Sequence, residues 1–397
     1  MPKLREAIYL VAALRTPIGK FGGGLSSLTA PQLGTAAARA TLERSGIDPT
    51  AIDEVIFGNA RQAGVGPNAA RQIAIKSGLR HEVPAYTVNQ ACGSGLRAIM
   101  NAADQLRLGE AEVILAGGTE SMSNTPYLLT RARWGQRMGD GELIDGMIRD
   151  GFLCPLADEM MGSTAETLAE RYGISREEQD RFAVESQVKA GRAYEENRFA
   201  DEIVPVTVAG KKGDVVIARD EHPRFDATLD SMSKLPPAFR KQGSVHAGNS
   251  SGVTDGAASM LVASERAVRE HGLKPMARIV GYAQAGVDPK VMGIGPVPAT
   301  RKLLDETGLT LDDVDLIELN EAFAAQVIAC DRELHLDHAK LNVHGGAISL
   351  GHPIGATGAR ITTTLLHALQ SREQKLGLAT LCISGGMGLS MLVERLP

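Results

Sequence analysis

The stretch RSGIDPTAIDEVIFGNA, residues 44–60, is repeated in outline by ETGLTLDDVDLIELNEA, residues 306–322. In both stretches the end of a helical segment is followed by a glycine, an acidic turn and an apolar segment. Gly46 corresponds to Gly308, and a glycine just past a periodic segment is a helix stop signal. Each stretch therefore predicts a helix that ends at its glycine and a strand that follows it.

The likeness extends beyond these two stretches. Asp53 stands opposite Asp315, and ACGSGLRAIMNAADQL and HPIGATGARITTTLLHAL both lead from a glycine-rich turn through an arginine into an apolar-periodic helix. EVILAGGTESM and ATLCISGGMGLSM are apolar strands that break at a Gly-Gly pair. Such distant copies indicate duplicated domains rather than a solenoid, whose period is about 20–50 residues. Strands that alternate with helices predict an α/β fold with mainly parallel sheets covered by helices.

The composition limits the class of protein. A chain of 397 residues is too long for one ordinary core. A net charge of −5 argues against nucleic acid or an anionic membrane as the main partner. The N-terminal segment indicates a first strand rather than a signal peptide, and no stretch approaches the roughly 18 apolar residues of a membrane span. The four widely spaced cysteines indicate neither a disulfide framework nor a metal site, which favours a reduced, cytoplasmic enzyme.

A different kind of segment separates the two copies. Residues 123–253 are polar and rich in methionine, which indicates an inserted loop domain. Within it, SREEQDRFAVESQVKAGRAYEENRF predicts a long helix, with Ser175 as its N-cap and Glu178 completing a capping box.

Cys92 and His352 stand out because each occupies the strand-to-helix turn of its own copy. If the copies pack around a pseudo-twofold axis, these turns face each other at the carboxyl ends of strands, where α/β enzymes place their sites. The positive end of the following helix and a nearby imidazole would favour the thiolate of Cys92. Gly93 and Gly95 would allow close approach and free backbone N–H groups for an oxyanion.

Most of the other candidate residues are expected to have a structural role rather than a catalytic one. Cys154 and Cys330 are expected to be small core residues. Cys382 ends an apolar strand at glycines, so its position fits a core role and a functional role equally well. A dinucleotide fold is excluded, because CGSGLRA offers no GxGxxG and no acidic residue at the spacing a ribose needs. The remaining histidines are expected to be surface or structural: His81, His222, His246, His271, His335, His338 and His367.

Five segments together resemble the thiolase family. They are VNQACGSGLRAI (88–99), AGNSSGVTDGAA (247–258), NEAFA (320–324), GGAISLGHPIGATGAR (345–360) and CISGGMG (382–388). The resemblance implies a duplicated α-β-α-β-α core of five layers with an inserted loop domain that covers coenzyme A. The expected division is residues 1–122 plus 254–273 for the N-terminal half, 123–253 for the loop domain and 274–397 for the C-terminal half.

The resemblance also implies a role for each catalytic residue. Cys92 would be the nucleophile that takes the acyl group, and His352 would activate it. Cys382 would be the acid/base at the α-carbon of acetyl-CoA. Asn320 would hold a water that stabilises the enolate oxygen together with His352. The backbone N–H groups of Cys92 and Ser384 would form the oxyanion hole.

A second set of residues is implied for substrate binding. Met161, Met292, Ala322 and Phe323 would line the acyl pocket, and Ser251, Phe239, Arg224 and Ser231 would contact coenzyme A. Three positions depart from the family pattern. Ser384 replaces the usual glycine, His344 stands where asparagine is common, and Met160 takes the place of a histidine in short-chain members. The departure at Met160 leaves the acyl chain length open.

The expected function is an acetyl-CoA C-acyltransferase that favours acetoacetyl-CoA, works through a Cys92 acyl-enzyme and uses coenzyme A as a substrate with no further cofactor. The alternatives are a broader-chain 3-ketoacyl-CoA thiolase of fatty-acid degradation and a non-catalytic CoA- or lipid-binding relative. A ketosynthase-type enzyme is disfavoured because that class lacks a second catalytic cysteine at the position of Cys382. The resemblance further implies a homo-oligomer, either a tetramer or at least a dimer.

Overall fold

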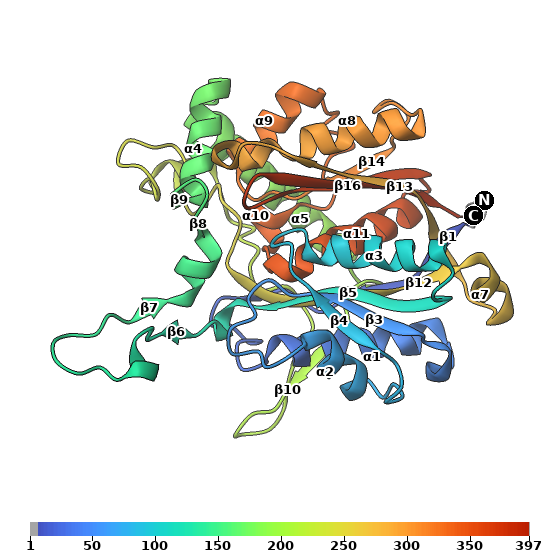
Figure 1. The fold of residues 1–397 in the computed structure, drawn as a ribbon. Coiled ribbons are helices and arrows are strands. Elements are labelled where there is room, and N and C mark those ends of the chain that lie inside the picture. The colour runs from blue at the N-terminus through green and yellow to red at the C-terminus, as the bar shows by residue number, and fades with distance from the viewer. Residues whose placement is uncertain (1–6, 397) are drawn as a thin grey trace.

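The computed structural model describes residues 7–396, and two similar α/β halves lie face to face in it. Figure 1 shows five layers: α8 and α9, one group of strands, the central helices α3 and α11, a second group of strands, and α1 with α2. The outermost ends of the expected halves, residues 1–6 and 397, lie outside the described residues. The expectation of a five-layered α-β-α-β-α core is confirmed.

The N-terminal half consists of the elements before and just after the insert. Its strands are β1 (Ile8–Arg15), β2 (Gly19–Lys20), β3 (Glu54–Gly58), β4 (Ala85–Val88), β5 (Val113–Ser121) and β12 (Thr254–Ser264). Its helices are α1 (Ala30–Ser45), the 3₁₀ turn η1 (Pro49–Ala51), α2 (Ala69–Lys76), α3 (Ser94–Leu108) and α7 (Glu265–Glu270).

The C-terminal half repeats this arrangement. Its strands are β13 (Pro275–Gly286), β14 (Leu316–Leu319), β15 (Leu376–Ile383) and β16 (Met387–Arg395). Its helical elements are η5 (Pro289–Ile294), α8 (Pro296–Thr307), α9 (Ala324–Leu334), α10 (Ala347–Leu350) and α11 (Ile354–Ser371). Residues Ile354 to Leu369 of α11 are all buried, as expected for a helix between two sheets.

The duplication is visible at two aspartates. The Asp53 carboxylate accepts hydrogen bonds from the backbone N–H groups of residues 112 and 113, at 2.7 and 3.0 Å, where β5 begins. Asp315 accepts the same pair of bonds from residues 375 and 376, at 3.0 and 2.8 Å, where β15 begins. Gly46 and Gly308 end their helices with φ of 67° and 69°. The predicted repeat is therefore confirmed at the level of individual bonds.

The prediction of mainly parallel sheets is wrong. Neighbouring strands follow the order β14-β15-β16-β13-β1-β12-β5-β3-β4, and only β3–β4, β3–β5 and β14–β15 are parallel. A short turn joins β15 to β16, and adjacent strands joined by a short turn are antiparallel. β1 and β13 also pair antiparallel, so the two half-sheets form one continuous ladder.

The segment between β5 and β12 holds the predicted long helix. Its strands are β6 (Tyr127–Leu128), β7 (Ile144–Asp145), β8 (Leu153–Cys154), β9 (Glu159–Met160), β10 (Val206–Val208) and β11 (Val215–Ile217). Its helices are η2 (Met122–Asn124), η3 (Ala132–Trp134), η4 (Ile148–Phe152), α4 (Met161–Tyr172), α5 (Arg176–Glu195) and α6 (Leu229–Ser233). The capping box of Ser175 and Glu178 at the start of α5 is confirmed. The domain limits at 123 and 253 stay a prediction.

This inserted segment is anchored in the core rather than set apart from it. Leu168 of α4 shares a buried cluster with Ala325 and Ala329 of α9. Arg15 at the end of β1 is fully buried and forms ion pairs with Glu202 at 2.6 Å and Asp220 at 2.7 Å. These contacts hold the insert against both halves.

Candidate active site

Cys92 lies in the turn between β4 and α3, two residues before the helix begins. The turn places Ala91 at φ 45°, and Cys92 itself is 7% exposed. A Cβ added to Gly93 would lie 2.6 Å from the Cδ1 atom of Ile383, so the end of β15 packs closely against this turn. The glycine turn thus brings the N-terminal half into contact with the strand that carries Cys382.

Cys382 and Ser384 lie beside Cys92 at the end of β15. Burial, and to a smaller extent the charge of Cys92, raises the pKa of Cys382. The backbone N–H of Ser384 donates a hydrogen bond toward the Cys92 sulfur. The N–H of Ser384 therefore points to the sulfur of Cys92, and its part in an oxyanion hole stays a prediction.

The ring of His352 is oriented by its own helix. Its Nδ1 atom lies 2.6 Å from Oγ1 of Thr357, and that hydroxyl donates to the carbonyl oxygen of Pro353 at 3.0 Å. Because the hydroxyl proton is used on Pro353, Nδ1 must donate to Thr357, which leaves Nε2 as the unprotonated nitrogen. Burial, together with the charges of Arg360 and Arg61, lowers the pKa of His352 to about 3. The imidazole is therefore neutral and able to accept a proton through Nε2.

Asn320 follows β14 and is held by its backbone, whose N–H donates to the carbonyl oxygen of Thr380 at 3.0 Å. Its side chain is 1% exposed, and neither Oδ1 nor Nδ2 has a hydrogen-bond partner among residues 7–396. A buried amide without partners is costly unless it binds a water or a ligand. This is the environment expected for a residue that holds a catalytic water.

The expected acyl pocket residues form one small cluster. Met292, Ala322 and Cys382 are buried together, and Met161 and Phe323 pack against them. The structure therefore brings the predicted pocket residues to the sulfur of Cys382. Their role in recognising an acyl chain stays a prediction.

The residues expected to bind coenzyme A fall into two groups. Ser251 donates its backbone N–H to the carbonyl oxygen of Ala322 at 3.0 Å, and the ring of Phe239 lies 6.0 Å from that of Phe323. Arg224 and Ser231 line a separate pocket of about 230 Å³. The Ser231 hydroxyl oxygen accepts the backbone N–H of Thr228 at 3.0 Å in the capping box of α6, so a structural reason suffices for this residue.

The expectation that the thiolate of Cys92 is favoured is wrong for the protein without substrate. Burial raises the pKa of the Cys92 thiol, and the opposing effects of Arg61 and the Ser384 N–H are smaller. Burial also raises the pKa of Cys382. Both sulfurs therefore rest as thiols beside a neutral imidazole.

Two buried charged residues of the site were not predicted. Glu120 on β5 is fully buried, and Arg61, 7% exposed, follows β3; the charges of both act on Cys92. A glutamate inside the apolar strand EVILAGGTESM was a signal, because buried carboxylates need specific partners.

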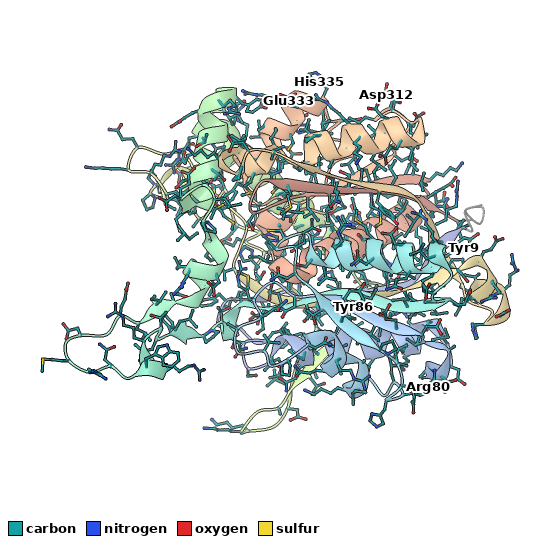
Figure 2. All side chains as sticks on the ribbon, in the orientation of Figure 1. Tyr9, Arg80, Tyr86, Asp312, Glu333 and His335 are labelled. Atoms are coloured by element: carbon teal, nitrogen blue, oxygen red, sulfur yellow. The ribbon has the colours of Figure 1, made fainter. Side chains whose placement is uncertain are left out.

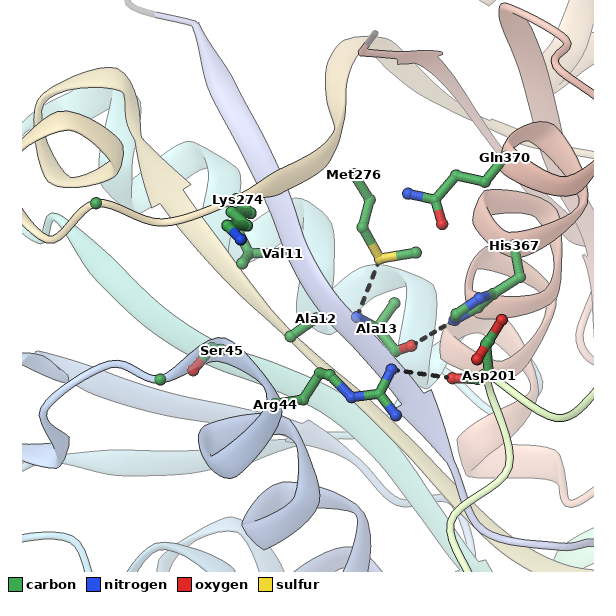
Figure 3. Close-up of a pocket in the computed structure, with 12 residues that line it drawn as sticks. Val11, Ala12, Ala13, Arg44, Ser45, Asp201, Lys274, Met276, His367 and Gln370 are labelled. Carbon is green, nitrogen blue, oxygen red and sulfur yellow. Dashed lines mark hydrogen bonds between the residues drawn. The ribbon is translucent and has the colours of Figure 1, made fainter.

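The thiol of Cys330 donates to the carbonyl oxygen of Gly293 at 3.3 Å, next to Met292 of the acyl-pocket cluster, and its charge adds to the effect of burial on the pKa of Cys382. The remaining candidates are structural or lie at the surface, as expected. Cys154 and Cys330 are buried thiols, and all four cysteines are free. His246 is buried and bonds Asp180 at 2.6 Å, and His335 lies at the outer surface in Figure 2. His367 lines the pocket of about 410 Å³ in Figure 3, where it contacts the carbonyl of Ala13 at the far end of α11 from His352.

Comparisons with known proteins agree with this architecture. The thiolase N-terminal domain matches residues 8–266 and the thiolase C-terminal domain matches residues 273–395. The acetyl-CoA acetyltransferase of Syntrophomonas wolfei is 53% identical over 397 residues, covering 99% of this chain and 100% of the relative. The acetyl-CoA acetyltransferase of Escherichia coli is 52% identical, covering 98% of each chain.

Solved structures show the same relationship. The acetyl-CoA acetyltransferase of Bacillus anthracis superposes with a TM-score of 0.97 at 47% identity and covers 99% of each chain. Human mitochondrial 3-ketoacyl-CoA thiolase gives a TM-score of 0.96 at 44% identity, covering 99% of this chain and 100% of that one. Fold and sequence together define an acyltransferase with a duplicated α/β core. The chain belongs to the thiolase family.

Proposed function

We propose that this chain catalyses the reversible Claisen condensation of an acyl-CoA with acetyl-CoA, and the reverse CoA-dependent thiolysis of a 3-oxoacyl-CoA. The acyl group is carried on Cys92. The observation that carries this proposal is the contact between the turn of Cys92 and the end of β15, which holds Cys382 of the other half. The charge of Arg61 acts on both Cys92 and the neutral His352, which supports a common site. Coenzyme A is a substrate in this scheme, and no other cofactor takes part.

The resting protonation states suit the start of thiolysis. His352 takes the proton of Cys92 through Nε2, and the sulfur attacks the 3-carbonyl carbon, whose oxyanion is held by the N–H groups of Cys92 and Ser384. The bond between carbons 2 and 3 then breaks. The protonated Nε2 of His352 and the water on Asn320 stabilise the enolate oxygen, and Cys382 donates its proton to the α-carbon.

The second half of the cycle restores every proton. The thiol of coenzyme A gives its proton to Cys382 and attacks the acyl group on Cys92. Cys92 leaves as a thiolate and takes back its proton from His352. Condensation is the same sequence in reverse. The thioester on Cys92 keeps the acyl group at the energy of a CoA thioester, which makes both directions accessible.

Acetoacetyl-CoA is the favoured substrate. The apolar side chains of Met161, Met292 and Phe323 near Cys382 support the binding of an acyl group there, and similar proteins are named acetyl-CoA acetyltransferases. The second candidate is thiolysis of longer 3-oxoacyl-CoAs. It is favoured by Met160 in place of a histidine and by the similarity to human mitochondrial 3-ketoacyl-CoA thiolase.

An assay separates these functions. Addition of coenzyme A to magnesium–acetoacetyl-CoA is expected to remove its absorbance with the parent protein and not with Cys92→Ser. A series of 3-oxoacyl-CoAs of rising length then gives kcat/KM for each. A maximum beyond four carbons would favour the broader-chain function. No turnover at any length, with tight CoA binding, would favour a non-catalytic relative.

A homo-oligomer, specifically a tetramer, is part of the proposal. The β6–β7 segment extends away from the body in Figure 1. Trp134 is 83% exposed and Met138 is 96% exposed, and exposed apolar groups gathered on a projecting arm are typical of an interface. Light scattering should give four chains per particle, and fewer in the double variant Trp134→Ser, Met138→Ser.

A cytoplasmic location stays a prediction. No helix among residues 7–396 is long and apolar enough to cross a membrane.

A further inference from the structure

Glu120 joins the two halves at the catalytic turns. Its Oε2 atom accepts the backbone N–H of Gly355 at 2.8 Å, in the first turn of α11, three residues after His352. Its Oε1 atom accepts Nδ2 of Asn59 at 2.7 Å and the backbone N–H of Arg61 at 3.1 Å. Oε2 also accepts the N–H of Ala60 at 3.2 Å. One fully buried carboxylate thus binds both the N-terminal half and the helix that carries the catalytic imidazole.

The environment of Glu120 is that of an ionised carboxylate. All of its hydrogen-bonding partners are donors, which a carboxylate accepts and a protonated acid does not fully match. Burial raises the pKa of Glu120, and the positive charge of Arg61 and the N–H groups of Gly355, Arg61 and Ala60 oppose that rise. These hydrogen bonds therefore fix the position and orientation of the Glu120 carboxylate.

The packing around Gly355 leaves little freedom to the hydrogen bond between its N–H and Glu120. A Cβ at Gly355 would lie 2.7 Å from the N atom of Ala60 and 2.9 Å from Oε2 of Glu120. A Cβ at Gly118 would lie 2.3 Å from the carbonyl oxygen of Gly355. Backbone therefore lies directly against backbone at this junction, and Glu120 supplies the directional bond across it.

We propose that Glu120 is a positioning residue, which sets the place of His352 relative to Cys92 by holding the Gly355 N–H and the 59–61 loop together. The proposal rests on the proposed roles of Cys92 and His352. Misplacement of a catalytic group by about 1 Å costs on the order of a hundredfold in rate. Loss of this anchor should accordingly lower the rate of proton transfer from Cys92 rather than the binding of coenzyme A.

The test compares Glu120→Gln with a matched control, Glu202→Gln. Glutamine has nearly the same size as glutamate. Its NH₂ group is a donor and would face the donors around residue 120, so part of the hydrogen bonds that Glu120 accepts would be lost. Glu202 is an equally buried carboxylate that bonds Arg15 at 2.6 Å and Thr364 at 3.2 Å. Rapid-quench mass spectrometry measures acylation of Cys92 by acetyl-CoA, and steady-state thiolysis gives kcat and KM for coenzyme A separately.

Glu120→Gln should slow acylation and kcat by about 10- to 100-fold with KM for coenzyme A within twofold, whereas Glu202→Gln lowers only the melting temperature. Glu120→Asp, which keeps the charge but is shorter, should recover part of the rate and serves if the glutamine variant does not fold. Equal melting losses with unchanged acylation in both glutamine variants would overturn the proposal. Absence of acylated Cys92 in the parent protein would instead contradict the proposed function itself.

Discussion

Nδ1 of His352 lies 2.6 Å from the hydroxyl oxygen of Thr357, which is in the first turn of the helix that follows His352. Thr357→Val keeps the shape and removes the oxygen, so the ring loses the partner that selects its tautomer. We expect kcat to fall by about 10- to 100-fold, less than the full contribution of a general base, about 10²–10⁴-fold. Thr363→Val is the control, because the Thr363 hydroxyl bonds only the carbonyl of Ala359 within α11. Equal activity of the two variants would rule out tautomer selection by Thr357.

Alkylation of Cys92 should depend on pH in a defined direction. Burial raises the pKa of this thiol above its ordinary value of 9.0, so the reactive thiolate is scarce at neutral pH. The rate of labelling by iodoacetamide is therefore expected to keep rising beyond pH 9 in the absence of acyl-CoA. Peptide mapping should place the label on Cys92, and the Cys92→Ser variant should not take up this label. Label found mainly on Cys154 or Cys330 would contradict the nucleophile assignment.

Cys382→Ser should separate the two half-reactions. Cys92 and the N–H of Ser384 are untouched by this change, so acetyl-CoA still acylates the protein. Condensation requires removal of an α-proton, which a serine hydroxyl performs poorly because it is a much weaker acid and ionises less readily. Mass spectrometry should show an acetylated variant with no acetoacetyl-CoA formed. Formation of acetoacetyl-CoA by this variant at the rate of the parent protein would remove Cys382 from the acid/base role.

Asn320→Ala should lose activity without losing stability. Both polar atoms of this side chain lack partners among the described residues, so their removal breaks no internal hydrogen bond. Loss of one oxyanion donor lowers kcat by about 10²–10³-fold. Asn342→Ala is the comparison, because the Asn342 side chain bonds Leu319 twice, at 2.9 Å each. Thermal unfolding should show a clear loss for Asn342→Ala only; a similar loss for Asn320→Ala would mean that Asn320 is structural.

Gly355→Ala should destabilise the protein although alanine favours helices. The added methyl would lie 2.7 Å from backbone at Ala60, and overpacking of this kind costs about 1–3 kcal/mol. Gly191→Ala in α5 is the matched control, since its nearest contact would be an ordinary 3.4 Å from Phe225. Chemical denaturation is expected to show the control as neutral or up to about 1 kcal/mol more stable. Comparable stability of both variants would show that the junction relaxes.

Short-range sequence patterns were enough to predict much of the fold and of the site. Gly46, Gly308 and the Ser175 capping box mark helix ends through bonds made within a few residues, so the sequence predicts them well. Cys92 and His352 were located because each occupies a glycine-rich turn of a repeated unit. The repeat also predicted that these turns face each other.

Other features depend on distant contacts. A strand pattern does not reveal direction, so the antiparallel return of β16 after Ser384 was not predicted. The raised pKa of Cys92 comes from burial by both halves. The bond from Gly355 to Glu120 joins residues far apart in the chain, and only the folded structure shows it.

The reciprocal packing of α3 and α11 also fixes how many reaction centres a chain contains. A Cβ at Gly95 would meet Ala359, and one at Gly358 would meet Leu96, so CGSGLR and GATGAR occupy equivalent places. In that alignment Gly355 occupies the place of Cys92, and Asn89 occupies that of His352. Of these two equivalent turns only one therefore carries a cysteine, and the place of its counterpart is filled by the backbone of Ala60 and the carboxylate of Glu120. Titration with an acyl donor should saturate at one equivalent for every chain.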